Sequence, residues 1–405
     1  MEETILKIKL AVFFGGNSVE HEVSVITALQ AIRSIDTEKY EVIPVYIDKN
    51  NCMYTGFLVG RIEFYSDISA LKRQSIRVVP VRDGGKIRLV KYPSRFGNKV
   101  ISEVDIAFPM GHGTDVEDGV LQGLLQFLGV PYVGCDVLSA ACGMNKYVQK
   151  ILLKHEGVPV LDCVKIRRAE FFDDGEKVVK IIKEKIGFPA VIKPINLGSS
   201  VGIKVAENSD SALEALEHSF LFANEIIAER AVQNLREINV SVLGDSDDAI
   251  ASECEEPVAD GEILSYDDKY LSGDSKNKSS KSPSQGLASL SRKIPADIPK
   301  ELREKIREIA VTAFKSLGCS GVARIDFLYD SLNDELFYNE INTLPGSLSF
   351  YLWGPVGVNY TELLSRMIDL AMKREREIKS IKTSFETNIL SGARLGGIKG
   401  GKGKI

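Results

Sequence analysis

The sequence predicts an α/β protein that becomes α+β in its C-terminal part. Over residues 7–150, runs with strand character alternate with runs of helical spacing, an order typical of an open parallel sheet. From about residue 236 the pattern is mixed, and the segments VARIDFLYD and ELFYNEIN flank a turn-rich SLND, which predicts a β-hairpin. A chain of 405 residues is long enough for two or three domains.

The composition argues against several classes of protein. The 51 basic and 56 acidic residues leave a net charge of −5, so we expect neither a nucleic-acid nor a membrane partner, which usually require a basic excess. No uncharged run approaches the ~18 apolar residues of a membrane span, and the early run IKLAVFFGG fits a core strand better than a signal peptide. The six cysteines form no CxxC pair, which favours a reducing cytoplasm over a disulfide framework or zinc site.

The first elements form a domain predicted to span residues 1–140. KLAVFF is strand-like and leads through GGNS into the helical run VEHEVSVITALQAIRSI. Further strands are indicated by EVIPVYI and VDIAFPM, a helix by DGVLQGLLQFLG and a short strand by PYVG. Strands that alternate with helices in this way predict a parallel sheet with helices packed on it.

Two further subdomains and a tail follow. In residues 141–233, the helix NKYVQKILLKHEG precedes the strands FPAVIKP and VGIKVA, which the loop NLGSS joins, and then a helix and the strand IIAERAV. In residues 234–378, the strand REINVSVLG, the helix PKELREKIREIAVTAFKSLG and the hairpin precede a last helix, TELLSRMIDLAMKRER. The Ser/Lys-rich segment 271–290 predicts a mobile loop, and the Gly/Lys-rich residues 379–405 predict a flexible tail.

The hairpin carries four polar side chains that we expect on one face. Residues two apart on a strand point to the same side of a sheet, so Arg324 lies beside Asp326, and Glu340 beside Asn342. If the strands pair, this face presents three oxygen ligands and one guanidinium, a set that suits Mg²⁺ completed by phosphate oxygens. The alternative interpretation is the solvated outer face of a hairpin.

Other polar residues stand at predicted strand ends and loops. Lys193 ends a strand before NLGSSVG, whose backbone N–H groups can cradle phosphate, although GSSVG is also an ordinary hairpin turn. Glu20 either binds an amine in a cleft or completes a capping box with Asn17, and the neighbouring His21 fits a helix surface. His112 follows a strand at the sheet edge where ligands gather, though a lone histidine is more often structural.

The order of these motifs resembles that of the D-alanine–D-alanine ligase family in the ATP-grasp superfamily. The matching segments are FGGNSVEHEVS, HGTDVEDGVLQG, KPINLGSSVGI, DDKYLS, GVARIDF and NEINTLPG, within residues 9–375. The resemblance implies an ATP-grasp fold and a cytoplasmic homodimer that joins two D-alanines at the expense of ATP, for peptidoglycan precursor synthesis. ATP would phosphorylate the first carboxylate, and the second amine would displace phosphate.

The resemblance also implies roles for individual residues. Asp326, Glu340 and Asn342 correspond to the ligands of two Mg²⁺ ions, for which Mn²⁺ can substitute. Arg324 and the Gly346 N–H correspond to oxyanion donors. The nucleotide contacts correspond to Lys146, Lys193, Ser199, Ser200, Glu229, Arg230, Val232, Glu237 and Lys269.

Substrate contacts follow from the same resemblance. Glu20 corresponds to the anchor of the first D-alanine amine and, with Ser199 and Tyr270, to a hydrogen-bonded trio that ties the N-terminal domain to the loops. His112 corresponds to a histidine near the first substrate. Relatives that make D-alanine–D-lactate commonly lose the Tyr270 equivalent or supply a loop histidine. Tyr270 is present here and 271–293 contains no histidine, which favours an amine acceptor and a dipeptide product.

The acceptor loop departs from the family pattern. After NTxPG the family usually places a Ser-Leu pair that holds the carboxylate of the second substrate, and here those positions are Tyr351 and Leu352. Either the phenol serves as the donor, or Ser347 or Ser349 takes over. A ligase with another acceptor, such as D-serine or D-lactate, is therefore one alternative. The other is a nucleotide-binding module without ligase activity, which the intact metal and phosphate set disfavours.

Overall fold

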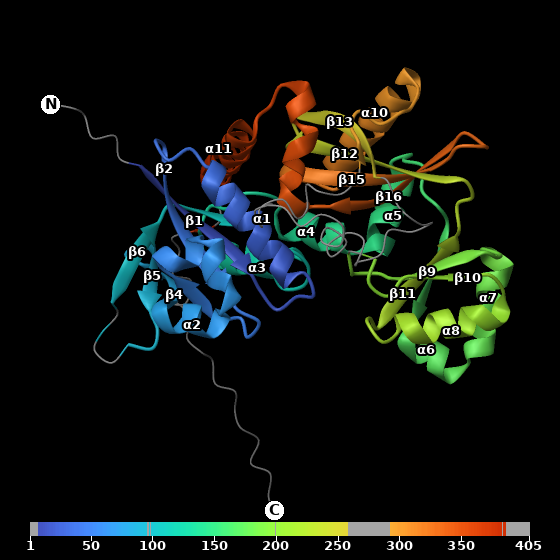
Figure 1. The fold of residues 1–405 in the computed structure, drawn as a ribbon, viewed down its shortest axis with the longest axis horizontal. Helices are drawn as coiled ribbons and strands as arrows, with labels where there is room; N and C mark the ends of the chain where they lie inside the picture. The colour runs from blue at the N-terminus through green and yellow to red at the C-terminus, as the bar shows by residue number, and fades with distance from the viewer. Residues whose placement is uncertain are drawn as a thin grey trace, which may run out of the picture.

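The computed structural model describes residues 7–94, 97, 99–198, 200–257, 292–382 and 384–385. Within these residues the strands form three β-sheets with helices packed on them (Figure 1). Figure 1 shows the C-terminal sheet between the N-terminal sheet and the central sheet. No described helix is both long enough and apolar enough to cross a membrane.

The N-terminal sheet is open, as predicted, but mixed rather than wholly parallel. Its strand order is β6-β5-β4-β3-β2-β1-β7, and β1 (Ile8–Gly15) pairs in parallel only with β2 (Tyr40–Ile47) and β7 (Ile106–Pro109). The remaining pairs are antiparallel, and all of them except β3 with β4 have connections too short for a parallel crossover. The other elements are α1 (His21–Ser34), β3 (Met53–Thr55), η1 (Phe57–Gly60), η2 (Ile62–Ser66), α2 (Ile68–Gln74), β4 (Ile76–Asp83), β5 (Lys86–Lys91), β6 (Val100–Val104) and α3 (Val120–Leu128).

Two local features of the N-terminal sheet follow from its sequence. Only Gly84 and Gly85 separate β4 from β5, and both have positive φ, 58° and 79°, which a tight hairpin between twisted strands requires. The predicted strand PYVG is reduced to an isolated parallel bridge between Tyr132 and Ala107. Its first residue, Pro131, has no N–H with which to extend a ladder.

The central sheet has the order β10-β9-β11-β8 and is antiparallel throughout. β9 (Ala190–Pro194) pairs directly with β10 (Lys204–Ala206), so the predicted strand–loop–strand arrangement around NLGSS is confirmed. The other elements are β8 (Cys163–Arg167), α6 (Arg168–Asp173), α7 (Gly175–Lys185), α8 (Ser209–Ser219) and β11 (Glu225–Arg230).

The C-terminal sheet has the order β14-β13-β12-β15-β16. β15 (Gly321–Asp330) and β16 (Glu335–Asn342) pair antiparallel, which confirms the predicted hairpin. Alternate residues, such as Ile238 and Ile325, point into an apolar core with the helices, which leaves the opposite face polar. The other elements are α4 (Val137–Met144), α5 (Lys146–His155), β12 (Leu235–Gly244), β13 (Ala249–Pro257), β14 (Arg292–Lys293), α10 (Lys300–Ser316), η5 (Gly346–Leu352), η6 (Gly354–Val356) and α11 (Tyr360–Ser380).

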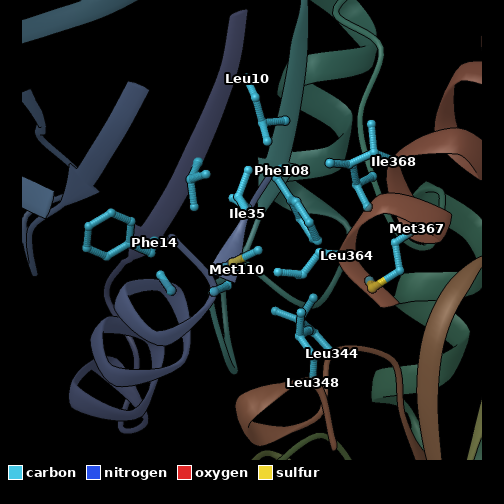
Figure 2. Close-up of a cluster of buried hydrophobic side chains, with 14 of the residues drawn as sticks. Leu10, Phe14, Ile35, Phe108, Met110, Leu344, Leu348, Leu364, Met367 and Ile368 are labelled. Carbon is cyan, nitrogen blue, oxygen red and sulfur yellow. The ribbon is translucent and has the colours of Figure 1, made fainter. Parts of the chain in front are cut away.

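The N-terminal sheet and the segment after β16 share one hydrophobic core. Figure 2 shows Leu10 and Phe108 of the sheet gathered with Leu344, Leu348 and Met367 of the C-terminal part. The loop after β16 is therefore positioned by two domains at once. The predicted mobile loop 271–290 and most of the tail 379–405 lie outside the described residues. The domain boundaries stay a prediction.

Candidate active site

Two cavities meet at the polar face of the C-terminal sheet. The larger, of about 600 Å³, has walls from the central and C-terminal sheets. The smaller, of about 120 Å³, is enclosed by the C-terminal sheet, the start of α1 and the loop after β16. Residues common to both walls are Lys146, Leu197, Gly198, Glu237, Asp326 and Glu340. A ligand in one cavity can therefore react with a ligand in the other across Asp326 and Glu340.

The hairpin places its four polar residues on the wall of the smaller cavity, and Asp326 and Glu340 also line the larger one. In the register of the two strands, Arg324 lies opposite Asn342, and Asp326 lies opposite Glu340. Arg324 donates from Nε and Nη2 to the two carboxylate oxygens of Asp326, each at 2.7 Å, and Asn342 Nδ2 donates to Asp326 Oδ2 at 3.2 Å. Burial disfavours the charged form of Arg324, but Asp326 raises its pKa above the ordinary value. The interpretation of this face as a solvated surface is wrong.

The oxygen atoms of this wall fit a hard cation. Asp326, Glu340 and Asn342 offer two carboxylates and one amide oxygen, the ligand types that Mg²⁺ prefers. Among the described residues no group of three His, Cys, Asp and Glu side chains could hold a metal ion by itself. A cation here would therefore need further oxygens, which phosphate groups in the larger cavity can supply.

A buried ion triad lies at the larger cavity, whose wall includes two of its members, Lys193 and Glu229. Lys193 forms an ion pair with Glu229, and Lys150 lies 2.9 Å from the other carboxylate oxygen of Glu229. Lys193 also donates to Asn339 Oδ1 at 2.9 Å, which ties the central sheet to β16. Burial opposes ionisation of Glu229, but the two lysines hold its pKa below the ordinary value. A third lysine, Lys146, donates to the Leu197 carbonyl at 2.6 Å and pairs with Glu340 at 2.8 Å.

Most other predicted nucleotide residues line the same cavity. Ser200, Val232 and Glu237 contribute to its wall. Arg230 also lines it and pairs with Glu335 at 2.8 Å. The structure thus brings the described members of the predicted nucleotide set to one cavity. Ser199, Lys269 and Tyr270 lie outside the described residues.

The start of α1 forms the opposite wall of the smaller cavity. The helix begins at His21 and no side chain caps it, so the predicted capping box of Asn17 and Glu20 is wrong. Ser18 Oγ accepts the Glu20 N–H at 3.0 Å, and this turn directs Glu20 into the cavity. A Cβ atom built on Gly198 would lie 3.5 Å from the Glu20 carboxylate, so the N-terminal domain closely approaches the NLGSS loop.

Comparisons with known proteins fit this arrangement. One family model, "D-ala D-ala ligase N-terminus", matches residues 9–135, and a second, "D-ala D-ala ligase C-terminus", matches residues 152–369.

The chain belongs to the D-alanine–D-alanine ligase family.

Known ligases match this chain over almost its full length. A D-alanine–D-alanine ligase of Thermosipho melanesiensis is 36% identical over 384 residues, which is 95% of this chain and 98% of that protein. A solved D-alanine–D-alanine ligase of Coxiella burnetii matches with a TM-score of 0.74 and 26% identity over 92% of this chain and 96% of that one. The solved VanG D-Ala:D-Ser ligase of Enterococcus faecalis matches with a TM-score of 0.73 and 30% identity over 90% and 100% of the two chains. Family membership implies an ATP-dependent ligase with an ATP-grasp fold.

Two histidines of the ligase are buried, and only His112 lines a cavity. His21, predicted on a helix surface, is buried because its ring bonds the Gly16 carbonyl at 2.7 Å and the Tyr46 hydroxyl at 3.0 Å. His112 lines the smaller cavity, with Nε2 2.9 Å from Thr27 Oγ1. Burial lowers the pKa of His112 to about 4, so the ring is neutral at physiological pH. His112 can orient a substrate by hydrogen bonding but supplies no positive charge.

Glu117 lines the smaller cavity, and sequence reasoning missed it. Its carboxyl accepts the N–H groups of Gly113 and Leu344, both at 3.1 Å, and so joins the N-terminal domain to the loop after β16. Burial, and then the charge of Glu20, raise its pKa from 4.5 to about 8. Its place within HGTDVEDG was the available signal, because an acid inside a loop at a strand end is a candidate site residue.

We expect a Glu117→Gln variant to lose less stability than the wild type between pH 5 and pH 8. Between 4.5 and about 8 the folded wild type keeps a proton that the unfolded chain has released, so its stability falls as the pH rises through that window. Glutamine does not titrate, so the variant should be spared a loss of roughly 3–4 kcal/mol. Urea unfolding midpoints of both proteins at the two pH values measure this. Parallel pH dependences would show that Glu117 is ionised in the folded ligase.

The loop after β16 has an unusual backbone. Ser347, Leu348 and Ser349 all have positive φ, between 48° and 53°, a conformation that costs a non-glycine residue roughly 1–2 kcal/mol. The Ser347 N–H donates to Thr27 Oγ1 at 3.0 Å, and the buried Trp353 donates to Ser241 Oγ at 3.2 Å. These contacts hold the strained turn in place. Strain of this kind is commonly found at ligand sites.

The two predicted acceptor residues have different positions. Tyr351 lines the smaller cavity, as does Gly346 at the start of the same loop. Leu352 is fully buried and is not among the residues of the cavity wall, so its side chain packs in the interior. Asn239, Glu255 and Arg292 also line the cavity, and no sequence signal identified them.

Proposed function

We propose that the chain is a D-alanine–D-alanine ligase that forms the dipeptide through an acyl phosphate. The observation that carries the proposal is the polar row of Arg324, Asp326, Glu340 and Asn342 on the wall of the smaller cavity, which Glu20 also lines. Two members of this row, Asp326 and Glu340, also line the larger cavity, where the lysines lie. Relatives at 34–37% identity over most of the chain bear this name. A nucleotide-binding module without ligase activity would not need the second cavity.

The first step transfers a phosphoryl group. ATP lies in the larger cavity with its phosphates near Lys146 and Lys193, and the first D-alanine lies in the smaller cavity with its ammonium on Glu20. One oxygen of the D-alanine carboxylate attacks the γ-phosphorus, the bond to the β-phosphate oxygen breaks, and ADP leaves. Positioning and charge neutralisation supply most of the catalysis in such a transfer.

The second step forms the peptide bond. The neutral amine of the second amino acid attacks the acyl carbon, and the resulting tetrahedral oxyanion is held by the Arg324 guanidinium and the Gly346 N–H. The carbon–oxygen bond to phosphate then breaks, and inorganic phosphate leaves together with the proton lost by the amine. A partly buried guanidinium is well suited to this role because charge–charge interactions are stronger away from water.

Asp326, Glu340 and Asn342 would hold two Mg²⁺ ions in this proposal, and Mn²⁺ can substitute. The ions would neutralise charge on the transferring phosphoryl group. Arg324 and Lys146, which pair with the two carboxylates in the structure, would remain beside them and contact substrate or phosphate. Ser199, Tyr270 and Lys269 belong to the proposal through the family resemblance alone, as the trio with Glu20 and as a lysine near the γ-phosphate.

D-alanine is the second substrate in this proposal, and the product is a dipeptide. D-serine is the second candidate, because a solved relative titled D-Ala:D-Ser ligase is 30% identical and Tyr351 replaces the usual serine. A cytoplasmic homodimer that serves peptidoglycan precursor synthesis completes the proposal, together with domains 1–140, 141–233 and 234–378 and a tail from 379.

We expect phosphate release from ATP with D-alanine alone, and a product with the mass of D-alanyl-D-alanine. The assay compares D-alanine alone with D-alanine plus D-serine or D-lactate at neutral pH, and mass spectrometry identifies the product. D-Alanyl-D-lactate without dipeptide would contradict the proposed amine acceptor. No phosphate release with any amino acid would favour the nucleotide-binding module.

A further inference from the structure

Tyr351 belongs to a buried cluster at one end of the smaller cavity. Its hydroxyl donates to Glu255 Oε1 at 3.2 Å, and the Arg292 guanidinium lies 4.0 Å from the centre of its ring. Arg292 Nη1 donates to Glu255 Oε2 at 2.9 Å, and Asn239 Nδ2 donates to Oε1 at 3.3 Å. All four side chains line the cavity, and the Glu255 side chain is only 3% exposed.

The Tyr351 phenol is not positioned to hold the carboxylate of the second substrate. A hydroxyl has one proton to donate, and the Glu255 carboxylate accepts it. Burial, and then the charge of Glu255, raise the pKa of Tyr351, so the phenol stays protonated and bonded. The stacked Arg292 restrains the ring in this position. A different group must therefore bind the carboxylate that a serine binds in the family pattern.

Arg292 is a cation at this end of the cavity. Among the described residues of the cavity wall the other cations are Lys146, which pairs with Glu340, and Arg324, which spans both oxygens of Asp326. These two lie at the phosphoryl-transfer end. A guanidinium carries five N–H donors and can bind carboxylates along more than one edge. The Tyr351 ring and Glu255 fix its plane, which lowers the entropic cost of binding.

Asn239 connects this end to the reacting end. In the register of the sheet, Asn239 lies opposite both Glu255 and Asp326, so these three side chains form a row with strand spacings of about 4.8 Å. The bond from Nδ2 to Glu255 fixes the amide orientation. Oδ1 is then buried and has no hydrogen-bond partner among the described residues. A buried acceptor of this kind is suited to a ligand N–H.

We infer that the second amino acid binds along this row, with its carboxylate on Arg292 and an amine hydrogen donated to Asn239 Oδ1. Glu255 and Tyr351 position Arg292. The inference rests on the proposed function and narrows the acceptor to an amine that carries a carboxylate a short distance away. The carboxylate points to the sheet edge at β14, and the amine points to the acyl carbon beside Arg324.

The test compares Glu255→Gln with the double variant Arg292→Met/Glu255→Gln. Removal of Arg292 alone would leave Glu255 as an unpaired buried charge, so both proteins carry the Glu255→Gln substitution. We expect the double variant to raise the KM of the acceptor D-alanine about 10- to 100-fold over Glu255→Gln, the effect of a lost bond to a charged group. Positional isotope exchange in ATP, measured with D-alanine present, reports the first step separately. The KM for ATP in this exchange should be the same for Glu255→Gln and for the double variant.

Substrate analogues and a third variant sharpen the test. Glu255→Gln should discriminate strongly between D-alanine and D-alaninamide as acceptors, and the double variant should largely lose this discrimination. The inference is overturned if the acceptor KM of the double variant stays within about threefold of the value for Glu255→Gln. It is also overturned if Tyr351→Phe raises the acceptor KM as much as the loss of Arg292 does. Absence of phosphate release by the wild type with D-alanine would instead contradict the proposed function.

Discussion

Replacement of Arg324 by alanine is expected to reduce turnover by about 10²- to 10³-fold while ATP binding is kept. Arg324 is partly buried on the wall of the smaller cavity and makes a bidentate pair with Asp326. The charge of Arg324 is needed in the smaller cavity, where the oxyanion develops. The lysines that bind the nucleotide lie in the larger cavity. Loss of Arg324 leaves Asp326 with more uncompensated charge, so affinity for Mg²⁺ and ATP should not fall.

Two variants and two measurements define the result for Arg324. Arg324→Lys keeps the charge but cannot bind two oxygens in a planar fork, so it should recover only part of the activity. Arg366→Ala, which removes an exposed pair with Glu362, is the matched control and should keep full turnover. Single-turnover phosphate release measures the chemistry, and calorimetric titration measures ATP binding. Turnover of Arg324→Ala close to that of the control would remove Arg324 from the mechanism.

The local part of the site could be predicted from the sequence. Arg324, Asp326, Glu340 and Asn342 lie on two strands joined by a short turn, so the two-residue period and the hairpin together placed them on one face. The NLGSS loop between β9 and β10 was predictable for the same reason. In both cases the two paired strands are close in sequence, so the prediction depended on a single strand pairing.

The rest of the site depends on contacts between residues far apart in sequence. Asn239 lies between Glu255 and Asp326 through the register of β12, β13 and β15, which no local pattern reveals. His21 looked exposed because its partner, Tyr46, is 25 residues away. The pKa of Glu117 is raised by burial between two domains, a property of packing rather than of residue type. Long-range register and burial are therefore the information that the sequence patterns lacked.

Glu229→Gln is expected to destabilise the ligase by about 3–5 kcal/mol at pH 7, because it leaves Lys150 and Lys193 as buried like charges without their carboxylate. The deficit should shrink as the pH rises. Burial already lowers the pKa of Lys150 from 10.5, and loss of Glu229 lowers it further. The folded variant then releases a proton that the unfolded chain keeps, so its stability increases with pH up to the ordinary lysine pKa.

Charge balance, rather than a single hydrogen bond, is what this experiment isolates. The double variant Glu229→Gln/Lys150→Met has one buried cation fewer and should regain at least half of the lost stability at pH 7. Glu335→Gln is the control, because its pair with Arg230 is about half exposed and should contribute less than about 1 kcal/mol. Urea unfolding at pH 7 and pH 9 measures all four proteins. Equal stability of Glu229→Gln and Glu335→Gln would mean that the three side chains of the buried triad carry no charge in the folded protein. Lys193 would then bring no charge to the nucleotide phosphates, and another residue would have to take its role in the first step.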